Sequence, residues 1–190
     1  MKNTPLLLCF LIIFSACKPD CKIEQAKVQE TLTIFGKENP EKQVVIQTQA
    51  GEIVIKLYNE TPLHRANFLR LVKNNYFKDR LFYRVVDGVC VQGGGEFDDR
   101  LGFTVPAEIR PNLKHKYGAI AMAMYDEDNL EKATSPTEFF IIANKNGYHT
   151  FDGEYTVFGE VIKGMNLIDN IYTSTIYDEK PVYPYYFTIK

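Results

Sequence analysis

The 190-residue sequence has no tryptophan, few cysteines and histidines, and no excess of either charge. It contains 22 lysines and arginines and 24 aspartates and glutamates, which gives a formal net charge of −2 at pH 7. Nucleic-acid-binding domains usually present a basic face, so we expect no nucleic-acid partner. No internal repeat or low-complexity segment is present, which leaves the chain without the pattern of a repeat protein.

The cysteines and histidines are too scattered to indicate a disulfide framework or a metal site. Cys21 and Cys90 lie far apart in the sequence, and their separation in space is not defined by it, so we infer no disulfide. His64, His115 and His149 have no carboxylate or cysteine at metal-ligand spacing, and we expect neither a metal nor another cofactor. His115, between two lysines, is expected in a solvated turn.

The N-terminal segment is typical of a secretory signal. Lys2 precedes an apolar run over 6–14, and small residues follow up to Cys17. The run is too short to span a bilayer, which takes about 20 apolar residues. Phe14-Ser15-Ala16-Cys17 resembles a bacterial lipobox with phenylalanine in place of the usual leucine. The resemblance implies cleavage after 1–16 and lipidation of Cys17, with a plain secreted protein as the alternative. We therefore expect a lipid-anchored protein of the bacterial cell envelope, on a periplasmic or outer membrane face.

We predict that residues 17–43 form a lipidated tether, because this segment is polar, charged and weakly patterned. Ile23, Leu32, Ile34 and Phe35 would also let part of this segment form a helix or dock onto the domain. From residue 44 to residue 190 the pattern becomes that of one folded domain.

Short apolar or alternating segments dominate this domain and predict a mainly β fold. The predicted strands are 44–49, 52–58, 81–86, 89–92, 118–124, 138–143, 155–162 and 183–189. Helices are predicted over 61–75, where Thr61-Pro62 provides a start signal, and over 165–172. Many short strands and few helices favour an antiparallel sheet that closes on itself and so has no open edges. No heptad seam indicates a dimer, and a monomer is expected.

The segment from Phe82 to Gly95 combines an apolar strand, one arginine, a glutamine and three glycines. Alternation places Phe82 and Arg84 on one face of the strand, with Val86, and puts Tyr83 and Val85 on the other. A buried unpaired charge is expensive, so Arg84 needs a partner or a function unless its head reaches water at a strand edge. The glycines lack the flanking residues of a phosphate-binding loop and predict a turn.

Residues 44–190 resemble the cyclophilin-type peptidyl-prolyl cis-trans isomerases. The matching motifs follow the family order: Ala50-Gly51, Thr61-Pro62 with Ala66-Asn67-Phe68, Phe82 to Val86 with Gln92-Gly93-Gly94, Gly118 with Ala121-Met122-Ala123, Phe139-Phe140-Ile141, and Phe151-Asp152-Gly153 with Val157 to Val161. The resemblance implies a closed antiparallel eight-stranded barrel capped by two helices. It also implies faster rotation about X-Pro bonds during the folding of exported proteins. A module that binds proline-containing segments with little or no turnover is the alternative.

The resemblance also implies a site. Arg84, Gln92 and Phe140 match the family's catalytic positions, and Arg84 would stabilise the twisted amide without a covalent step. The remaining substrate-binding positions are Val89, Cys90, Ala123, Met124, Glu138, Phe151 and Tyr155. The implied partners are proline-containing peptides or unfolded exported proteins, and the membrane is reached only through the lipid on Cys17.

Several of these positions depart from the family pattern. Val89 and Cys90 replace phenylalanine and methionine, so we expect a wider pocket. Glu138 replaces the glutamine beside the catalytic arginine. We hypothesise that Glu138 fixes Arg84 through a bidentate pair, the alternative being that it draws the guanidinium away from substrate. Tyr125 replaces an alanine and would narrow the side pocket next to the proline site.

Overall fold

The computed structural model describes residues 21–95, 101–125 and 129–190. The signal expected over 1–16 and the lipidation site Cys17 lie outside these described residues. Within the described ranges, every helix is too short or too polar to cross a bilayer.

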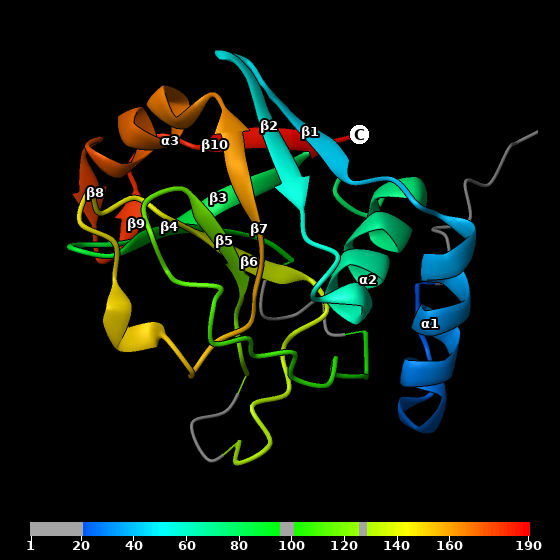
Figure 1. The fold of residues 1–190 in the computed structure, drawn as a ribbon. Coiled ribbons are helices and arrows are strands. Elements are labelled where there is room, and N and C mark those ends of the chain that lie inside the picture. The colour runs from blue at the N-terminus through cyan, green and yellow to red at the C-terminus, as the bar shows by residue number, and fades with distance from the viewer. Residues whose placement is uncertain (1–20, 96–100, 126–128) are drawn as a thin grey trace, which may run out of the picture.

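Eight antiparallel strands of the described chain close into a barrel, in the order β1-β10-β3-β4-β6-β5-β7-β2 (Figure 1). The strands are β1 (Gln43–Thr48), β2 (Gly51–Leu57), β3 (Arg80–Val86), β4 (Cys90–Gly94), β5 (Ala119–Met122), β6 (Glu138–Ile142), β7 (Val157–Lys163) and β10 (Tyr185–Ile189). Each corresponds to a strand predicted from the sequence, so the mainly β closed barrel is confirmed. Closure pairs every strand on both sides and leaves no exposed edge for aggregation.

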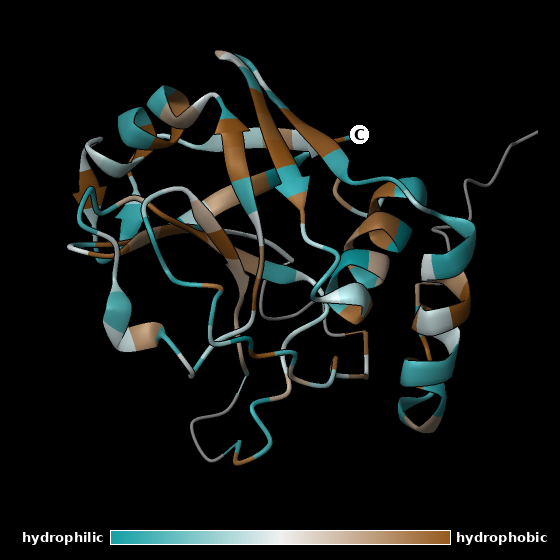
Figure 2. Ribbon diagram, viewed as in Figure 1, coloured by the Kyte–Doolittle hydropathy of each residue, from teal (hydrophilic) through white to brown (hydrophobic). Residues whose placement is uncertain are grey.

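Phenylalanine rings fill the interior of the barrel. Phe82, Phe139, Phe158 and Phe187 are at most 2% exposed, and the Phe82 and Phe187 ring centroids lie 4.6 Å apart. Phe68 enters from the helix that follows β2, with its centroid 5.6 Å from that of Phe139 and 5.2 Å from that of Phe158. Figure 2 shows hydrophobic residues concentrated on the strands and hydrophilic ones along the loops. The core therefore lies between the strands rather than on one face of an open sheet.

Two helices cap this barrel, as the resemblance implied. In the described chain they are α2 (Pro62–Lys73) and α3 (Met165–Tyr172), which lie on opposite sides of the barrel in Figure 1. Ile168 and Ile171 of α3 are buried. Pro62 occupies the start of α2, where its missing N–H leaves no helical hydrogen bond unmade.

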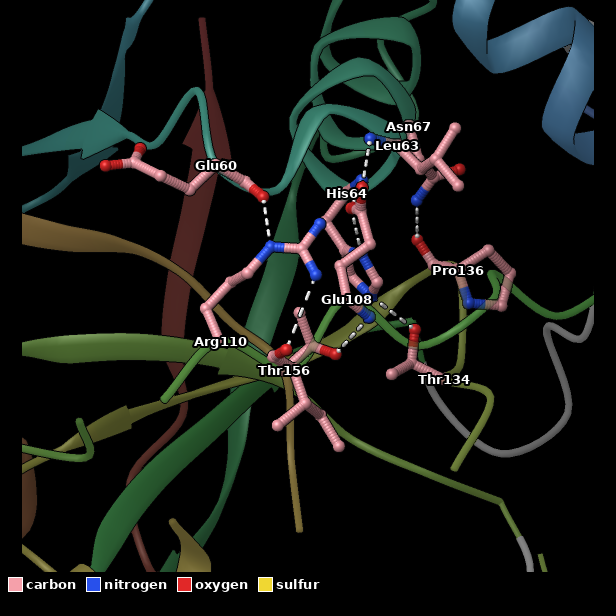
Figure 3. Close-up of polar contacts among 10 residues, drawn as sticks. Glu60, Leu63, His64, Asn67, Glu108, Arg110, Thr134, Pro136 and Thr156 are labelled. Carbon is pink, nitrogen blue, oxygen red and sulfur yellow. Dashed lines mark hydrogen bonds and ion pairs between the residues drawn. The ribbon is translucent and has the colours of Figure 1, made fainter. Parts of the chain in front are cut away.

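The N-terminus of α2 is capped by a distant carboxylate. Thr61 makes no capping hydrogen bond with its side chain. Instead the Glu108 carboxylate accepts from the main-chain N–H of Leu63 at 3.1 Å and of His64 at 2.9 Å. The His64 ring lies between Glu108 and Thr134, with Nδ1 2.7 Å from the carboxylate and Nε2 3.0 Å from the threonine hydroxyl (Figure 3). His64 therefore has the carboxylate partner that sequence spacing did not reveal.

The predicted tether contains a helix that docks onto the domain. This helix, α1 (Val28–Glu38), follows a short turn of 3₁₀ helix, η1 (Gln25–Lys27), and packs against α2. Val28 and Leu32 are 1% and 0% exposed and belong to the main core. For the described part of 17–43, the docked helix is thus the alternative that the structure adopts. The sequence left this alternative open, because the surface that α1 contacts lies on α2, a separate part of the chain.

Arginines of α2 hold the main chain of this N-terminal segment in place. Arg70 donates from Nη1 to the carbonyl of Cys21 at 2.9 Å, and Arg65 donates from Nη1 to the carbonyl of Asn39 at 3.1 Å. Cys21 itself is buried, and no disulfide joins it to Cys90. These contacts bind the segment to the domain on both sides of α1.

A β-bulge in β3 overturns the predicted alternation of its side chains. The pairing of β3 with β4 shifts register between Phe82 and Arg84. As a result Phe82 and Val85 both enter the core, at 1% and 3% exposure, while Tyr83 and Arg84 both reach Gln92 by hydrogen bonds. The prediction that Phe82 and Arg84 share a face was wrong, because one extra residue in a bulge exchanges the faces of the residues that follow.

The glycine run is part of the barrel. Gly93 and Gly94 belong to β4, which corrects the turn predicted there. Gly94 has φ 111°, and a Cβ at this position would clash with the carbonyl oxygen of Thr137. A side chain at Gly94 would therefore prevent the close approach of the chain that leads into β6.

A small hairpin that the sequence did not predict lies against β3. It consists of β8 (Ile176–Tyr177) and β9 (Lys180–Pro181), joined by Asp178 and Glu179. These two residues have φ of 49° and 58°, as in a tight two-residue hairpin turn. The N–H of Val85 donates to the carbonyl of Glu179 at 2.7 Å, which binds the hairpin tip to the barrel.

If α1 is an integral part of the fold, removing its core contact destabilises the protein. We expect Leu32→Ala to lower the free energy of unfolding by about 2–5 kcal/mol, because it leaves a cavity in the main core. Ile34→Ala on the same helix is the control, since Ile34 is 51% exposed. Urea denaturation of both variants measures the difference. Equal, small effects in the two would mean that α1 does not contribute to the core.

Candidate active site

Arg84, Gln92 and Phe140 are neighbours in one row across three adjacent strands. Arg84 of β3 pairs with Gln92 of β4, and Gln92 pairs with Phe140 of β6. Ala121 of β5 continues the row beside Phe140. Directly opposed residues of antiparallel strands point to the same face. The three residues that the sequence indicated as catalytic are thus brought together on the outside of the barrel.

Hydrogen bonds hold the polar end of this row. Arg84 donates from Nη1 to Oε1 of Gln92 at 3.1 Å. The amide nitrogen of Gln92 donates to the Tyr83 hydroxyl at 2.9 Å and to Oε2 of Glu138 at 3.3 Å. Tyr83 in turn donates to the same Glu138 oxygen at 3.0 Å. This network orients the Gln92 amide, with its oxygen toward Arg84 and its nitrogen toward Glu138.

The carboxylate paired with Arg84 is that of Glu179, not that of Glu138. Nε of Arg84 lies 2.7 Å from Oε2 of Glu179 at the tip of the β8–β9 hairpin. The predicted bidentate pair between Glu138 and Arg84 is therefore wrong. The Gln92 side chain lies between the two residues, accepting from Arg84 with its oxygen and donating to Glu138 with its nitrogen. The hydrogen bond to Glu179 raises the pKa of Arg84 above its usual value. Burial, and next the charge of Glu138, raise the pKa of Tyr83.

An apolar cluster adjoins the row. A cluster outside the barrel core contains Val89, Cys90, Ala123, Phe140, Phe151 and Tyr155. Phe140 contacts Phe151 and Tyr155 with ring centroids 5.8 and 5.4 Å apart. The structure thus gathers the residues that the resemblance assigned to a proline pocket.

Cys90 is an apolar wall of this cluster rather than a reactive thiol. It is 4% exposed. Burial raises the pKa of its thiol to about 12, against a smaller opposite effect of the Arg84 charge. Because the thiolate is the nucleophilic form, Cys90 stays neutral and unreactive near pH 7.

A groove of about 850 Å³ opens over the polar end of the row. Arg84, Gln92, Met124 and Glu138 line one part of it, and the hairpin and the chain that leads into β10 line the other. The apolar cluster around Phe140 is not in the lining of this groove and joins it through the Gln92–Phe140 pairing. The sequence missed the second wall, because the two residues of its turn are not glycine or asparagine and its strands are only two residues long.

Of the two residues that follow β5, Met124 lines the groove and Ala123 does not. Ala123 is buried, donating from its N–H to the carbonyl of Glu138 at 2.9 Å and accepting from the N–H of Ser135 at 2.8 Å, so the substrate contact expected of it is not available to its main chain. The main chain of Met124 makes no hydrogen bond with the rest of the described chain. Met124 therefore offers a donor and an acceptor at the groove, as its predicted role requires.

A buried histidine packs against the apolar cluster. His115 is 0% exposed and stacks on Phe140, with ring centroids 6.1 Å apart. Its Nδ1 lies 3.0 Å from Oδ1 of Asp152, and Nδ1 of His149 lies 3.0 Å from Oδ2 of the same carboxylate. The solvated turn predicted for His115 is wrong, since the flanking lysines point out while the ring packs inward. Across the part of the chain that the structure describes, no three such side chains form a group suited to a metal ion.

Burial sets the protonation of this histidine. Burial lowers the pKa of His115, and the hydrogen bond to Asp152 opposes the shift without cancelling it. Nε2 of His115 has no hydrogen-bond partner in the described chain, so a proton there would be buried without an acceptor. Burial raises the pKa of Asp152, but hydrogen bonds from His115 and His149 outweigh it and hold that pKa below its usual range.

Comparison with known proteins identifies relatives over the whole barrel. The family model described as cyclophilin type peptidyl-prolyl cis-trans isomerase/CLD matches residues 43–189. A peptidyl-prolyl cis-trans isomerase of Acinetobacter baylyi is 37% identical over 144 residues, covering 70% of this chain and 74% of that protein. Peptidyl-prolyl cis-trans isomerase B of Escherichia coli is 31% identical over 140 residues, covering 67% and 82%.

Solved structures give the same result for the fold. A cyclophilin type peptidyl-prolyl cis-trans isomerase of Cryptosporidium parvum, crystallised in the presence of the dipeptide Ala-Pro, superimposes with a TM-score of 0.64 and 26% identity. The match covers 77% of this chain and 96% of that one.

The low pKa of His115 predicts a loss of stability in mild acid. The unfolded state has the ordinary histidine pKa of 6.5, so below that pH it binds more protons than the folded state. The contribution of His115 to the free energy of unfolding is then fully present above pH 6.5, and it is lost as the pH drops toward the folded-state pKa. We expect His115→Asn to flatten the decline in urea midpoint between pH 7.5 and 5. The same decline in both proteins would contradict this assignment, and an NMR titration of the His115 ring reads the shift directly.

Proposed function

Because the chain belongs to the cyclophilin family of peptidyl-prolyl cis-trans isomerases, we propose that it accelerates X-Pro rotation by a non-covalent mechanism centred on Arg84. Amide resonance gives this rotation a barrier of roughly 18–20 kcal/mol, and uncatalysed exchange takes tens to hundreds of seconds. No bond is made or broken. The catalyst must bind the twisted amide more tightly than either planar form.

The observation that carries this mechanism is the row Arg84–Gln92–Phe140. A proline ring held against Phe140, Phe151 and Tyr155 would place its carbonyl and imide nitrogen toward Arg84. As the amide twists, the nitrogen loses conjugation and becomes a better hydrogen-bond acceptor, so a fixed guanidinium stabilises the transition state more than the ground state. The relative crystallised with Ala-Pro supports a proline-containing ligand.

The groove provides room for the chain around the proline. Main-chain groups of Met124 are available to pair with an extended peptide. Backbone pairing is independent of side-chain identity, which suits a catalyst that meets many unfolded sequences. The proline pocket supplies the selection.

Arg84→Ala tests the mechanism. We expect kcat/KM in a protease-coupled proline-isomerisation assay to fall on the order of a hundredfold, as for loss of one preorganised donor at a transition state. Arg84→Lys keeps the charge but lacks the planar fork of donors, and it should recover only part of the activity. Binding of a proline-containing peptide, followed by NMR, should persist in both variants. Equal rates in wild type and Arg84→Ala would leave only a proline-segment binding module.

We also propose that the protein is a lipoprotein that assists exported proteins from a membrane surface. The N-terminal pattern that ends at Cys17 supports this role. Only Lys18, Pro19 and Asp20 separate Cys17 from Cys21, whose carbonyl is bonded to Arg70 of α2. An anchor at Cys17 would therefore hold the isomerase domain close to the membrane instead of at the end of a long tether.

Cys17→Ser tests the anchor. We expect the variant to lose labelling by a fatty-acid precursor and to leave the membrane fraction in the native host, while its isomerase activity per molecule is unchanged. Cys9→Ser alters a cysteine within the expected signal and serves as the control that keeps the label. A labelled Cys17→Ser variant would rule out this lipidation site.

A further inference from the structure

We propose that Glu179, at the tip of the β8–β9 hairpin, is a positioning residue that holds the Arg84 guanidinium in its working orientation. The inference rests on the proposed role of Arg84 and adds a second element of the chain to it. The hairpin lies against β3 and forms one wall of the groove above Arg84.

Two of the three guanidinium nitrogens of Arg84 are hydrogen-bonded within the protein, and the third is left for a substrate. Nε donates to Oε2 of Glu179 at 2.7 Å, and Nη1 donates to Oε1 of Gln92 at 3.1 Å. Nη2 makes no hydrogen bond with any residue that the structure describes. Two partners on different nitrogens prevent the planar group from turning. Nη2 is the nitrogen that a substrate would meet. Glu179 therefore orients Arg84 without occupying the donor that the substrate needs.

The carboxylate is presented by a rigid part of the hairpin. The carbonyl of Glu179 accepts from the N–H of Val85 at 2.7 Å, and Val85 is the residue that follows Arg84. The main chain of Glu179 is thus bonded to that of Val85, next to the side-chain contact between Glu179 and Arg84. A short, anchored connection of this kind leaves the carboxylate little freedom to move away.

The backbone of the turn does not itself call for glutamate at this position. Glu179 has φ 58° and Asp178 has φ 49°, both in the left-handed region that glycine adopts more easily. The side chains of Arg84 and Glu179 are 43% and 50% exposed, and exposed ion pairs add little stability. The two-residue turn itself requires positive φ at both positions, so glycine would fit this backbone as well. Neither the turn nor the stability of the pair therefore requires glutamate at position 179, and what the glutamate adds is its contact with Arg84.

Holding the arginine would act on the chemical step. A half-exposed arginine with one partner samples several rotamers, and only some of them aim a donor at the twisting amide. If the guanidinium is already fixed, no conformational entropy has to be lost to orient it at the transition state. The bound ground state needs the proline pocket more than it needs Arg84. Loss of Glu179 should consequently lower kcat and leave KM nearly unchanged.

Glu179→Gly separates positioning from folding. Glycine is favoured at positive φ, so this variant should keep or raise the melting temperature while it removes the carboxylate. We expect its kcat to fall roughly tenfold, with KM within about twofold of wild type. Glu179→Gln keeps an acceptor for Nε and should recover most of that loss. Tyr177→Thr changes an 80% exposed residue of the same hairpin that is not among those lining the groove, and it should match wild type.

NMR of the Arg84 Nε–H group gives a readout that does not depend on activity. We expect one sharp, slowly exchanging Hε signal in wild type and a broadened or absent signal in Glu179→Gly. An unchanged kcat in Glu179→Gly would overturn the positioning role, and a higher kcat would show that Glu179 competes with substrate. A wild-type protein no faster than Arg84→Ala would instead refute the proposed function of Arg84, whatever the NMR spectra show.

Discussion

The bulge in β3 is the constraint on which the site depends. A regular strand would place Phe82 and Arg84 on the same face, and either an arginine would enter the aromatic core or a phenylalanine would leave it. The register shift lets Phe82 and Val85 face the core while Tyr83 and Arg84 reach outward to Gln92. One inserted residue thus separates the part of the strand that stabilises the barrel from the part that serves the groove.

The barrel wall also divides the apolar residues into two groups with different functions. Phenylalanines inside the barrel pack against one another and against Phe68 of α2. A second cluster around Phe140 lies outside that core, beside Arg84 in the cross-strand row. Because strands in a closed sheet are paired on both sides, the outer cluster rests on a stiff support. Under the proposed function, this supported cluster is the surface against which a proline ring would pack.

Polar groups near the site are held by partners from remote parts of the chain. Glu108 accepts from the start of α2, and Asp152 binds both His115 and His149. Glu138 accepts from Tyr83 and Gln92. Each of these carboxylates thus has hydrogen-bond donors, which polar groups need when they are withdrawn from water. The outcome is a groove in which the orientation of Arg84 and Gln92 is decided before a substrate arrives.

Local sequence patterns determined the strands and the two capping helices, because apolar periodicity and start signals depend on near neighbours. The residues of the apolar cluster were indicated by the family resemblance and not by local pattern. Tertiary structure alone decided what depends on residues far apart: the bulge at Tyr83, the docking of α1, the burial of His115 and the pairing of Arg84 with Glu179 across 95 positions. The sequence identified Arg84 as the residue that needs a partner. Only the closure of the barrel, which brings the hairpin against β3, showed which carboxylate that partner is.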